Sequence, residues 1–184
     1  MYRLYKLMFS VKVQLLLAAL VGSAPALVLA QSPPAAGSVL VIPGVPGEST
    51  VVPGGIDILS YSIGAEVPVG MPRANFSDFN FTANTSSASP VLLLNVAMQR
   101  HAPTATIFVR RTDLDGQPQY LTYTLTDVTV GKVLDNTPST PGLPVEGFSL
   151  RYARIAIEYH VVNPDGTLGP PILACWDVVR QAAC

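Results

Sequence analysis

The chain has 184 residues with a formal net charge of −1, and only 12% of them are charged, against roughly 25% in typical soluble chains. This near-neutral balance gives no support to a nucleic-acid partner. A surface so poor in charge has apolar area to cover, which favours self-association.

Residues 1–30 have the order of a secretory signal peptide. Basic residues (Arg3, Lys6 and Lys12) precede an apolar run and then small residues before Gln31. We expect cleavage between Ala30 and Gln31, which leaves eight basic against twelve acidic residues and no stable membrane anchor. The alternative is an uncleaved anchor, but the uninterrupted apolar run is shorter than the ~20 residues that span a bilayer.

The remaining chain is predicted to form a short leader, residues 31–37, and one domain, residues 38–184. The leader is small and proline-rich. The domain is long enough to bury a single core without staples or cofactors. Its segments alternate apolar and polar residues with a period of two, which predicts β-strands at about 38–43, 55–64, 75–81, 120–134 and 147–162.

Two of these strands change phase. In the strand at 120–134, the apolar positions shift by one residue between Leu125 and Val128, which predicts a bulge near Asp127. In the strand at 147–162, they shift between Tyr152 and Ala153. Phase changes in long strands are typical of a closed or strongly curled sheet.

One segment has no strand pattern. Ser89 is a good helix N-cap, Pro90 suits the first helical position, and an apolar run follows as far as Pro103. We expect one short helix at about residues 90–101, packed against the side or one end of a barrel or sandwich.

At this point the sequence resembles the Hcp family, the haemolysin-coregulated tube proteins of type VI secretion. The resemblance rests on blocks that occur in the family's order and spacing: "IPGVPGES" (42–49), "IDILSYSIG" (56–64), "FSDFNFT" (76–82), "YLTYTLTDVTV" (120–130), "GFSLRYARIAIEY" (147–159) and "CWDV" (175–178). It implies a mainly β fold, an Hcp-like closed β-barrel or two curled antiparallel sheets with one short flanking helix.

The resemblance also implies a function. Family members form hexameric rings that stack into a tube, carry small effectors in the lumen and catalyse no reaction. This chain departs from the family in two ways: it has a signal peptide, and the segment after Gly64 is shorter and contains prolines. The leading hypothesis is therefore a non-enzymatic homo-oligomeric ring of the secretion tube, located in the cytoplasm and then secreted. The alternatives are an exported periplasmic or extracellular Hcp-like ring or binding module, and more remotely a secreted hydrolase on a β-scaffold.

No catalytic, cofactor-binding or metal-binding set is predicted. The two histidines, His101 and His160, are interpreted as surface or cap residues because no ligand accompanies them at useful spacing. Asp113 and Asp115 are interpreted as part of a hairpin turn rather than a calcium loop. Trp176 is expected to be a core or interface aromatic whose indole nitrogen finds one partner.

The two cysteines, Cys175 and Cys184, have no metal-type spacing. An exported chain meets an oxidising compartment, so a disulfide between them is one expectation. Two free thiols remain the alternative, because the spacing alone does not define the Cα geometry.

Overall fold

A computed structural model describes residues 37–114, 116, 118–136 and 142–184. The predicted signal peptide, its cleavage point between Ala30 and Gln31, and the leader up to residue 36 lie outside this range. The described part is rich in strands and contains one helix, α1 (Ala88–Ala97). The strands are β1 (Ser38–Val41), β2 (Ile56–Ile58), β3 (Ser60–Ser62), β4 (Ala65–Glu66), β5 (Asn75–Phe76), β6 (Phe79–Asn84), β7 (His101–Arg110), β8 (Gln119–Asn136), β9 (Val145–Arg151), β10 (Arg154–Val162), β11 (Leu168–Asp177) and β12 (Ala182–Ala183).

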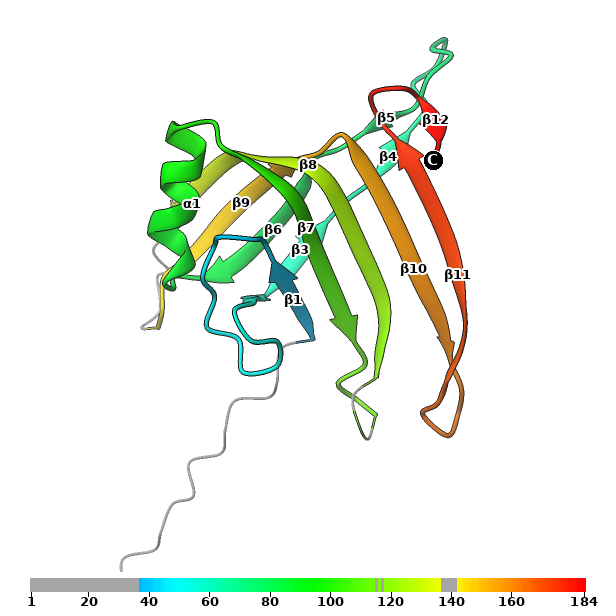
Figure 1. Ribbon diagram of the computed structural model, residues 1–184, viewed down its shortest axis with the longest axis horizontal. Coiled ribbons are helices and arrows are strands. Elements are labelled where there is room, and N and C mark those ends of the chain that lie inside the picture. Colours follow the sequence, from blue (N-terminus) through cyan, green and yellow to red (C-terminus); the bar gives the residue numbers. More distant parts are fainter. Residues whose placement is uncertain (1–36, 115, 117, 137–141) are drawn as a thin grey trace, which may run out of the picture. The chain divides into compact units, whose positions relative to one another are not determined.

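Ten of these strands form one antiparallel sheet. Its main path runs β12, β11, β10, β8, β7, β1, β2, and a branch leaves β8 through β9 and β6 to β3. The remaining two strands, β4 and β5, form a separate hairpin. Figure 1 shows α1 at one end of the sheet, with β10 and β11 at the other.

The predicted curled antiparallel architecture with one flanking helix is confirmed, but no closed barrel is found in the pairing of the described strands. The path ends at β2 and its branch ends at β3. These two strands follow each other in the chain and are separated by Leu59, whose N–H donates to the carbonyl oxygen of Thr82 at 2.8 Å. The sheet therefore curls back on itself, but in the described part of the chain β2 and the strand next to it in space, β6, are joined by this single hydrogen bond at Leu59 and not by a paired ladder.

Strand β8 is the element shared by both branches. Its first part pairs with β7 and β10, and its second part pairs with β9. At the change of partner Asp127 has a φ of 54°, and both Leu125 and Val128 are fully buried. The predicted change of phase near Asp127 is therefore present in the strand. The predicted bulge is misplaced, because the pairing with β7 runs past Asp127 without a shift and the register shift against β9 lies between Val130 and Lys132.

The second predicted phase change marks a break between two strands. Tyr152 and Ala153 separate β9 from β10, and the N–H of Ala153 donates to the carbonyl oxygen of Thr126 at 3.0 Å. The single long strand expected at 147–162 is thus two strands, because β9 and β10 lie against different parts of β8.

The helix begins and ends earlier than the sequence predicts. Its N-cap is Ser87, which makes no side-chain capping bond, and Ser89 lies inside the first turn. The hydroxyl of Ser89 is not free to cap, since it donates a short hydrogen bond to the buried carboxylate of Glu146 in β9. A residue 57 positions away in the chain therefore determines the role of this serine.

At the other end, a left-handed residue closes the helix well before Pro103. Gln99 has a φ of 51°, its N–H donates to Val96 O, and the next N–H, of Arg100, donates to Asn95 O. This is the hydrogen-bond pattern of a Schellman motif. Pro103 itself lies within β7.

The core is an aromatic and aliphatic cluster enclosed by the curled sheet and α1. Phe81 stacks on Phe148 with a centroid distance of 4.8 Å, and Phe79 stacks on Tyr61 at 5.5 Å. Leu92 is the large apolar residue that α1 buries completely. The large apolar side chains of α1 and β11 that do not join this cluster are exposed on the outside of the domain.

Candidate assembly surfaces

The strand β11 presents an exposed apolar edge. Among the described strands it pairs with β10 along one side, and on the other side β12 covers only Trp176 and Asp177. Ile172 and Leu173 point to opposite faces of the strand and are 60% and 70% exposed. An edge strand with large apolar side chains on both faces is a surface suited to contact with another chain.

The helix α1 is apolar on its outward side as well. Leu93, Leu94 and Met98 are all more than half exposed, although Leu92 beside them is buried. A helix that is apolar all round is normally buried on every side. Its outward side is therefore a second candidate contact surface.

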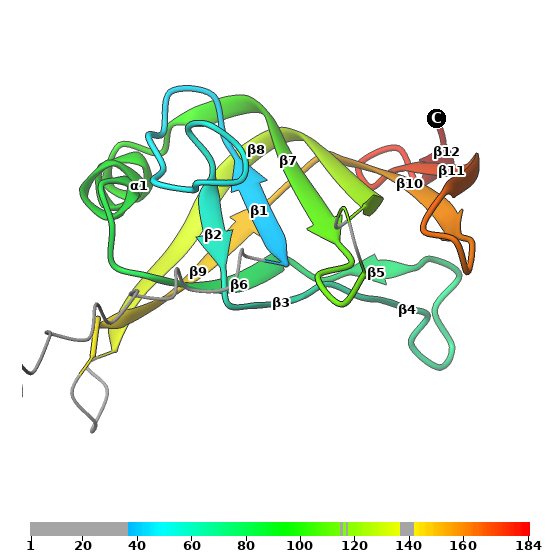
Figure 2. The same cartoon turned by 90° about the horizontal axis from the view of Figure 1, so that it is seen from below.

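Residues 64–77 form a projecting arm built on the β4–β5 hairpin. In both Figure 1 and Figure 2 this arm lies near the end of the sheet formed by β10–β12. Its tip carries the exposed apolar residues Val67, Val69 and Met71. At its base the N–H of Ser77 donates to Gly64 O, and the hydroxyl of Tyr152 donates to Ser77 O, both at 2.9 Å.

Two shallow depressions lie on the sheet. The first, of about 280 Å³, has a mixed lining, with polar side chains of β3 and β6 and Lys132 beside the apolar side chains of Tyr61, Phe81, Leu134 and Phe148. The second, of about 410 Å³, crosses β8, β10 and β11 and is lined by small side chains, including Thr122, Thr124, Ala156, Ala183 and the two cysteines. Both are open hollows rather than enclosed catalytic pockets.

The described residues hold no arrangement typical of a metal site. No three His, Cys, Asp or Glu side chains gather there closely enough to bind a metal ion. Ser89 and Glu146 are 9% and 6% exposed, and their bond joins the first turn of α1 to β9, so the pair is a structural contact. No helix in the part of the chain that the structure describes is long and apolar enough to cross a bilayer.

Comparison with known proteins shows which family has this fold. The family model described as "Type VI secretion system effector, Hcp" matches residues 39–159, which is more than half of the chain. The chain belongs to the Hcp family. Protein hcp1 of Pseudomonas aeruginosa is 25% identical over 107 residues, which are 58% of this chain and 66% of that protein. The chain therefore spans slightly less than two thirds of this relative.

Solved structures support the same fold. Hcp1 from Salmonella typhimurium superposes with a TM-score of 0.70 at 24% identity, over 80% of this chain and 97% of that one. A structure described as a type six secretion system protein gives a TM-score of 0.73 at 19% identity, over 80% and 98%. A type VI secretion system effector from Yersinia pestis gives 0.63 at 24% identity, over 77% and 99%. The likeness in fold thus extends over about 80% of the chain.

In this Hcp chain the two histidines lie apart and have different surroundings. His101 is exposed, and its Nδ1 lies 2.8 Å from a carboxylate oxygen of Asp127. His160 is less exposed and faces two acceptors, with Nδ1 2.8 Å from Gly169 O and Nε2 2.9 Å from a carboxylate oxygen of Glu158. The carbonyl and the carboxylate together raise the pKa of His160. The sequence pattern did not indicate this double contact, because Gly169 lies across the β10–β11 hairpin.

Of the other residues that the sequence singled out, Asp113 and Trp176 form contacts that support the fold. Asp113 forms two hydrogen bonds with the guanidinium of Arg111, which lowers the pKa of Asp113 to about 2. Asp115 lies outside the described residues. Trp176 is half-buried and stacks on Phe76, but its indole N–H has no hydrogen-bond partner among the described residues, so the prediction of one partner was wrong. Its position is determined by packing instead.

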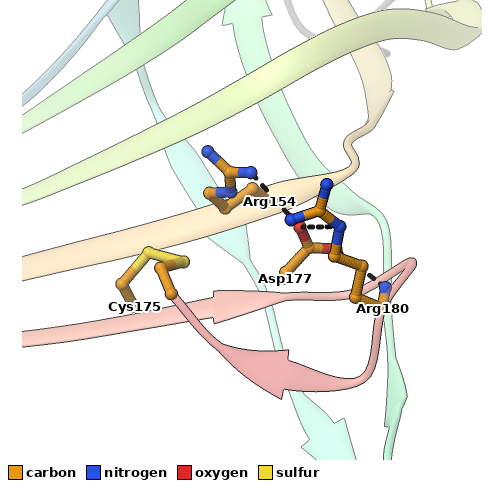
Figure 3. Close-up of a disulfide and its surroundings, with 5 residues drawn as sticks. Arg154, Cys175, Asp177 and Arg180 are labelled. Atoms are coloured by element: carbon orange, nitrogen blue, oxygen red, sulfur yellow. Dashed lines mark hydrogen bonds and ion pairs between the residues drawn. A yellow bond between two sulfur atoms is a disulfide. The ribbon is translucent and has the colours of Figure 1, made fainter.

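The structure joins Cys175 and Cys184 in a disulfide, with their Cα atoms 5.4 Å apart. Figure 3 shows this bond beside an ion-pair cluster of Arg154, Asp177 and Arg180. Asp177 accepts the backbone N–H of Arg180 at 2.8 Å and a guanidinium N–H of Arg154 at 3.2 Å. These two contacts, with the backbone N–H first, lower the pKa of Asp177. The C-terminal turn is thus held by a carboxylate as well as by the disulfide.

Proposed function

We propose that the chain forms homo-oligomeric, hexameric rings that act as a tube component and effector carrier of type VI secretion and catalyse no reaction. Membership of the Hcp family supports the role. The observation that carries the ring itself is the exposed edge of β11, where Ile172 and Leu173 present apolar area on both faces. In a ring, each copy contacts one neighbour on either side and needs a contact surface for each. The exposed edge of β11 is suited to be one of these two surfaces.

The contribution of one such side chain can be estimated. Burying a large aliphatic side chain completely is worth about 1.5–3 kcal/mol, so covering the exposed 70% of Leu173 contributes about 1–2 kcal/mol at each contact. This corresponds to roughly a five- to thirtyfold change in the dissociation constant of each contact. A charge at this position adds a desolvation cost and should separate the subunits.

The test is the mass of the purified chain in solution. Light scattering coupled to gel filtration at micromolar concentration should give a hexamer for the wild type and a monomer for Leu173→Asp. Leu143→Asp is the matched control, since Leu143 is a leucine of similar exposure, 64%, outside the sheet. A wild type that is monomeric throughout the micromolar range would refute the ring, and a hexameric Leu173→Asp would exclude the β11 edge from it.

A second candidate is an exported Hcp-like ring or binding module outside the secretion tube. The observation that favours it is the disulfide, since disulfides persist in oxidising compartments, and the sequence of residues 1–30 agrees with export. N-terminal sequencing of protein from a periplasmic fraction should begin at Gln31. An intact Met1 on cytosolic protein with two free thiols would contradict export and favour the tube. Neighbouring genes for a sheath and baseplate would also favour the secretion tube over an exported protein.

A further inference from the structure

We propose that the Cys175–Cys184 disulfide is an exchange site for a dithiol reductant, and that its oxidation state controls how firmly the arm (residues 64–77) is docked on β11. The observations behind this are the disulfide, the two-residue strand β12 and the stacking of Trp176 on Phe76. The proposal concerns a conformational change within one chain, so it does not depend on ring assembly.

The C-terminal strand is held by few contacts other than the disulfide. β12 pairs with β11 at only two positions, Trp176 with Ala183 and Asp177 with Ala182. The N–H of Cys184 adds a long contact of 3.3 Å to Cys175 O. A strand that is paired at only two positions, on one side, opens readily unless another contact ties it down. Asp177 and Val178 hold the turn before β12 through the Arg180 N–H and the Gln181 side chain, so the disulfide is the constraint on the far side of β12 from that turn.

The disulfide is accessible to a reductant. Cys184 is exposed, Cys175 is partly exposed, and both line the open depression of about 410 Å³. A thiolate of the dithiol attacks Cys184 Sγ and forms a mixed disulfide, and Cys175 leaves as a thiolate and takes up a proton. The second thiol of the reductant then displaces Cys184, which is also protonated. Two electrons and two protons pass to the protein, and the dithiol becomes a disulfide.

Trp176 connects this site to the arm. It directly follows Cys175, its backbone pairs with Ala183 beside Cys184, and its ring stacks on Phe76 of β5 at a centroid distance of 6.3 Å. The indole N–H has no hydrogen-bond partner among the described residues, so packing alone orients the ring. When β12 leaves, Trp176 loses the neighbour on its open side, and its stacking on Phe76 weakens.

Among the described residues the arm has few other contacts above its base, where Phe76 also packs against the edge of the core. The contacts of Ser77 with Gly64 and Tyr152 fix the base in either redox state. Beyond the base, β4 and β5 share only two paired positions, Ala65 with Phe76 and Glu66 with Asn75. The Phe76–Trp176 stack is thus the aromatic contact that fastens the arm to the large sheet.

The experiment compares the full-length chain before and after reduction with dithiothreitol, with free thiols counted in each sample. Trypsin cleavage after Arg73, an exposed residue of the arm, follows the population of undocked arms, and the fluorescence of Trp176 reports its stacking, since it is the only tryptophan of the chain. Reduction should raise the initial cleavage rate at Arg73 roughly three- to tenfold, as expected for loss of one aromatic pair, and shift the emission to the red. Unreduced Cys175→Ser/Cys184→Ser protein should match the reduced wild type.

Two variants test the route through the aromatic pair. Phe76→Leu should be cleaved rapidly at Arg73 in both redox states, whereas Tyr159→Leu, which removes the exposed ring contact with Tyr120 elsewhere in the sheet, should keep the wild-type dependence on reduction. Equal cleavage and emission in oxidised and fully reduced wild type would overturn the proposal. So would a loss of the strand signal in circular dichroism on reduction, because the change would then be global rather than confined to the arm.

Discussion

Replacing Ser89 by alanine should lower the free energy of unfolding by about 1–3 kcal/mol, because a buried carboxylate and a partly buried backbone N–H lose a partner. The Ser89 hydroxyl donates to the carboxylate of Glu146 and accepts the N–H of Ser86 at 3.0 Å. Ser89 and Glu146 are 9% and 6% exposed, so water does not replace these bonds without local opening. Ser87→Ala is the matched control, since this N-cap is exposed and forms no side-chain capping bond; we expect a change within about 0.5 kcal/mol.

Urea and thermal unfolding of the two variants, with the disulfide intact, measure this difference. For a domain of this size the Ser89→Ala cost corresponds to a fall in Tm of about 2–12 °C. A double-mutant cycle with Glu146→Gln should show a coupling energy between the two side chains. The reasoning fails if Ser87→Ala is as destabilising as Ser89→Ala, since the buried contact of Ser89 with Glu146 would then add nothing beyond an exposed serine at the N-cap.

Two further predictions follow from close packing and from protonation. Gly47→Ala should cost about 1–3 kcal/mol in thermal unfolding, because a Cβ there would lie 2.0 Å from the carbonyl oxygen of Gly55, whereas Gly142→Ala, with nothing within 4 Å, should be neutral. The pKa of His160 is raised in the folded state, so its stabilising contribution is complete below the unfolded value of about 6.5 and is lost as the pH rises through the folded value. His160→Gln should remove this part of the pH dependence of stability, and parallel stability curves for the two proteins would contradict it.

Local pattern was sufficient for most of the fold. Alternation of apolar and polar residues predicted the central strands, and the change of phase near Asp127 is present because that residue adopts a positive φ where β8 changes partner. The helix was predicted from Pro90 and the apolar run after it. Its start was misplaced because capping depends on which acceptor the serine hydroxyl meets, and Glu146 is distant in the sequence.

The candidate assembly surfaces were harder to predict. The exposure of Ile172 and Leu173 depends on β11 being the last long strand of the sheet, and strand order is a property of non-local pairing. The link between Trp176 and Phe76 joins segments one hundred positions apart, and neither residue has a sequence signal for it. The family could be recognised without these contacts, because its ordered blocks lie along the chain.

The composition of β11 also limits how another strand can add to it. Pro170 and Pro171 lack backbone N–H groups, and β12 already occupies the edge at Trp176 and Asp177. Cys175 O already accepts the N–H of Cys184, so between the prolines and β12 a strand from another molecule finds only residues 172–174 of β11 uncovered and able to donate. Open-ended growth of sheet by edge-to-edge addition needs a longer, uninterrupted ladder. The same strand that offers apolar side chains to a neighbour is thus protected against becoming the template of a fibril.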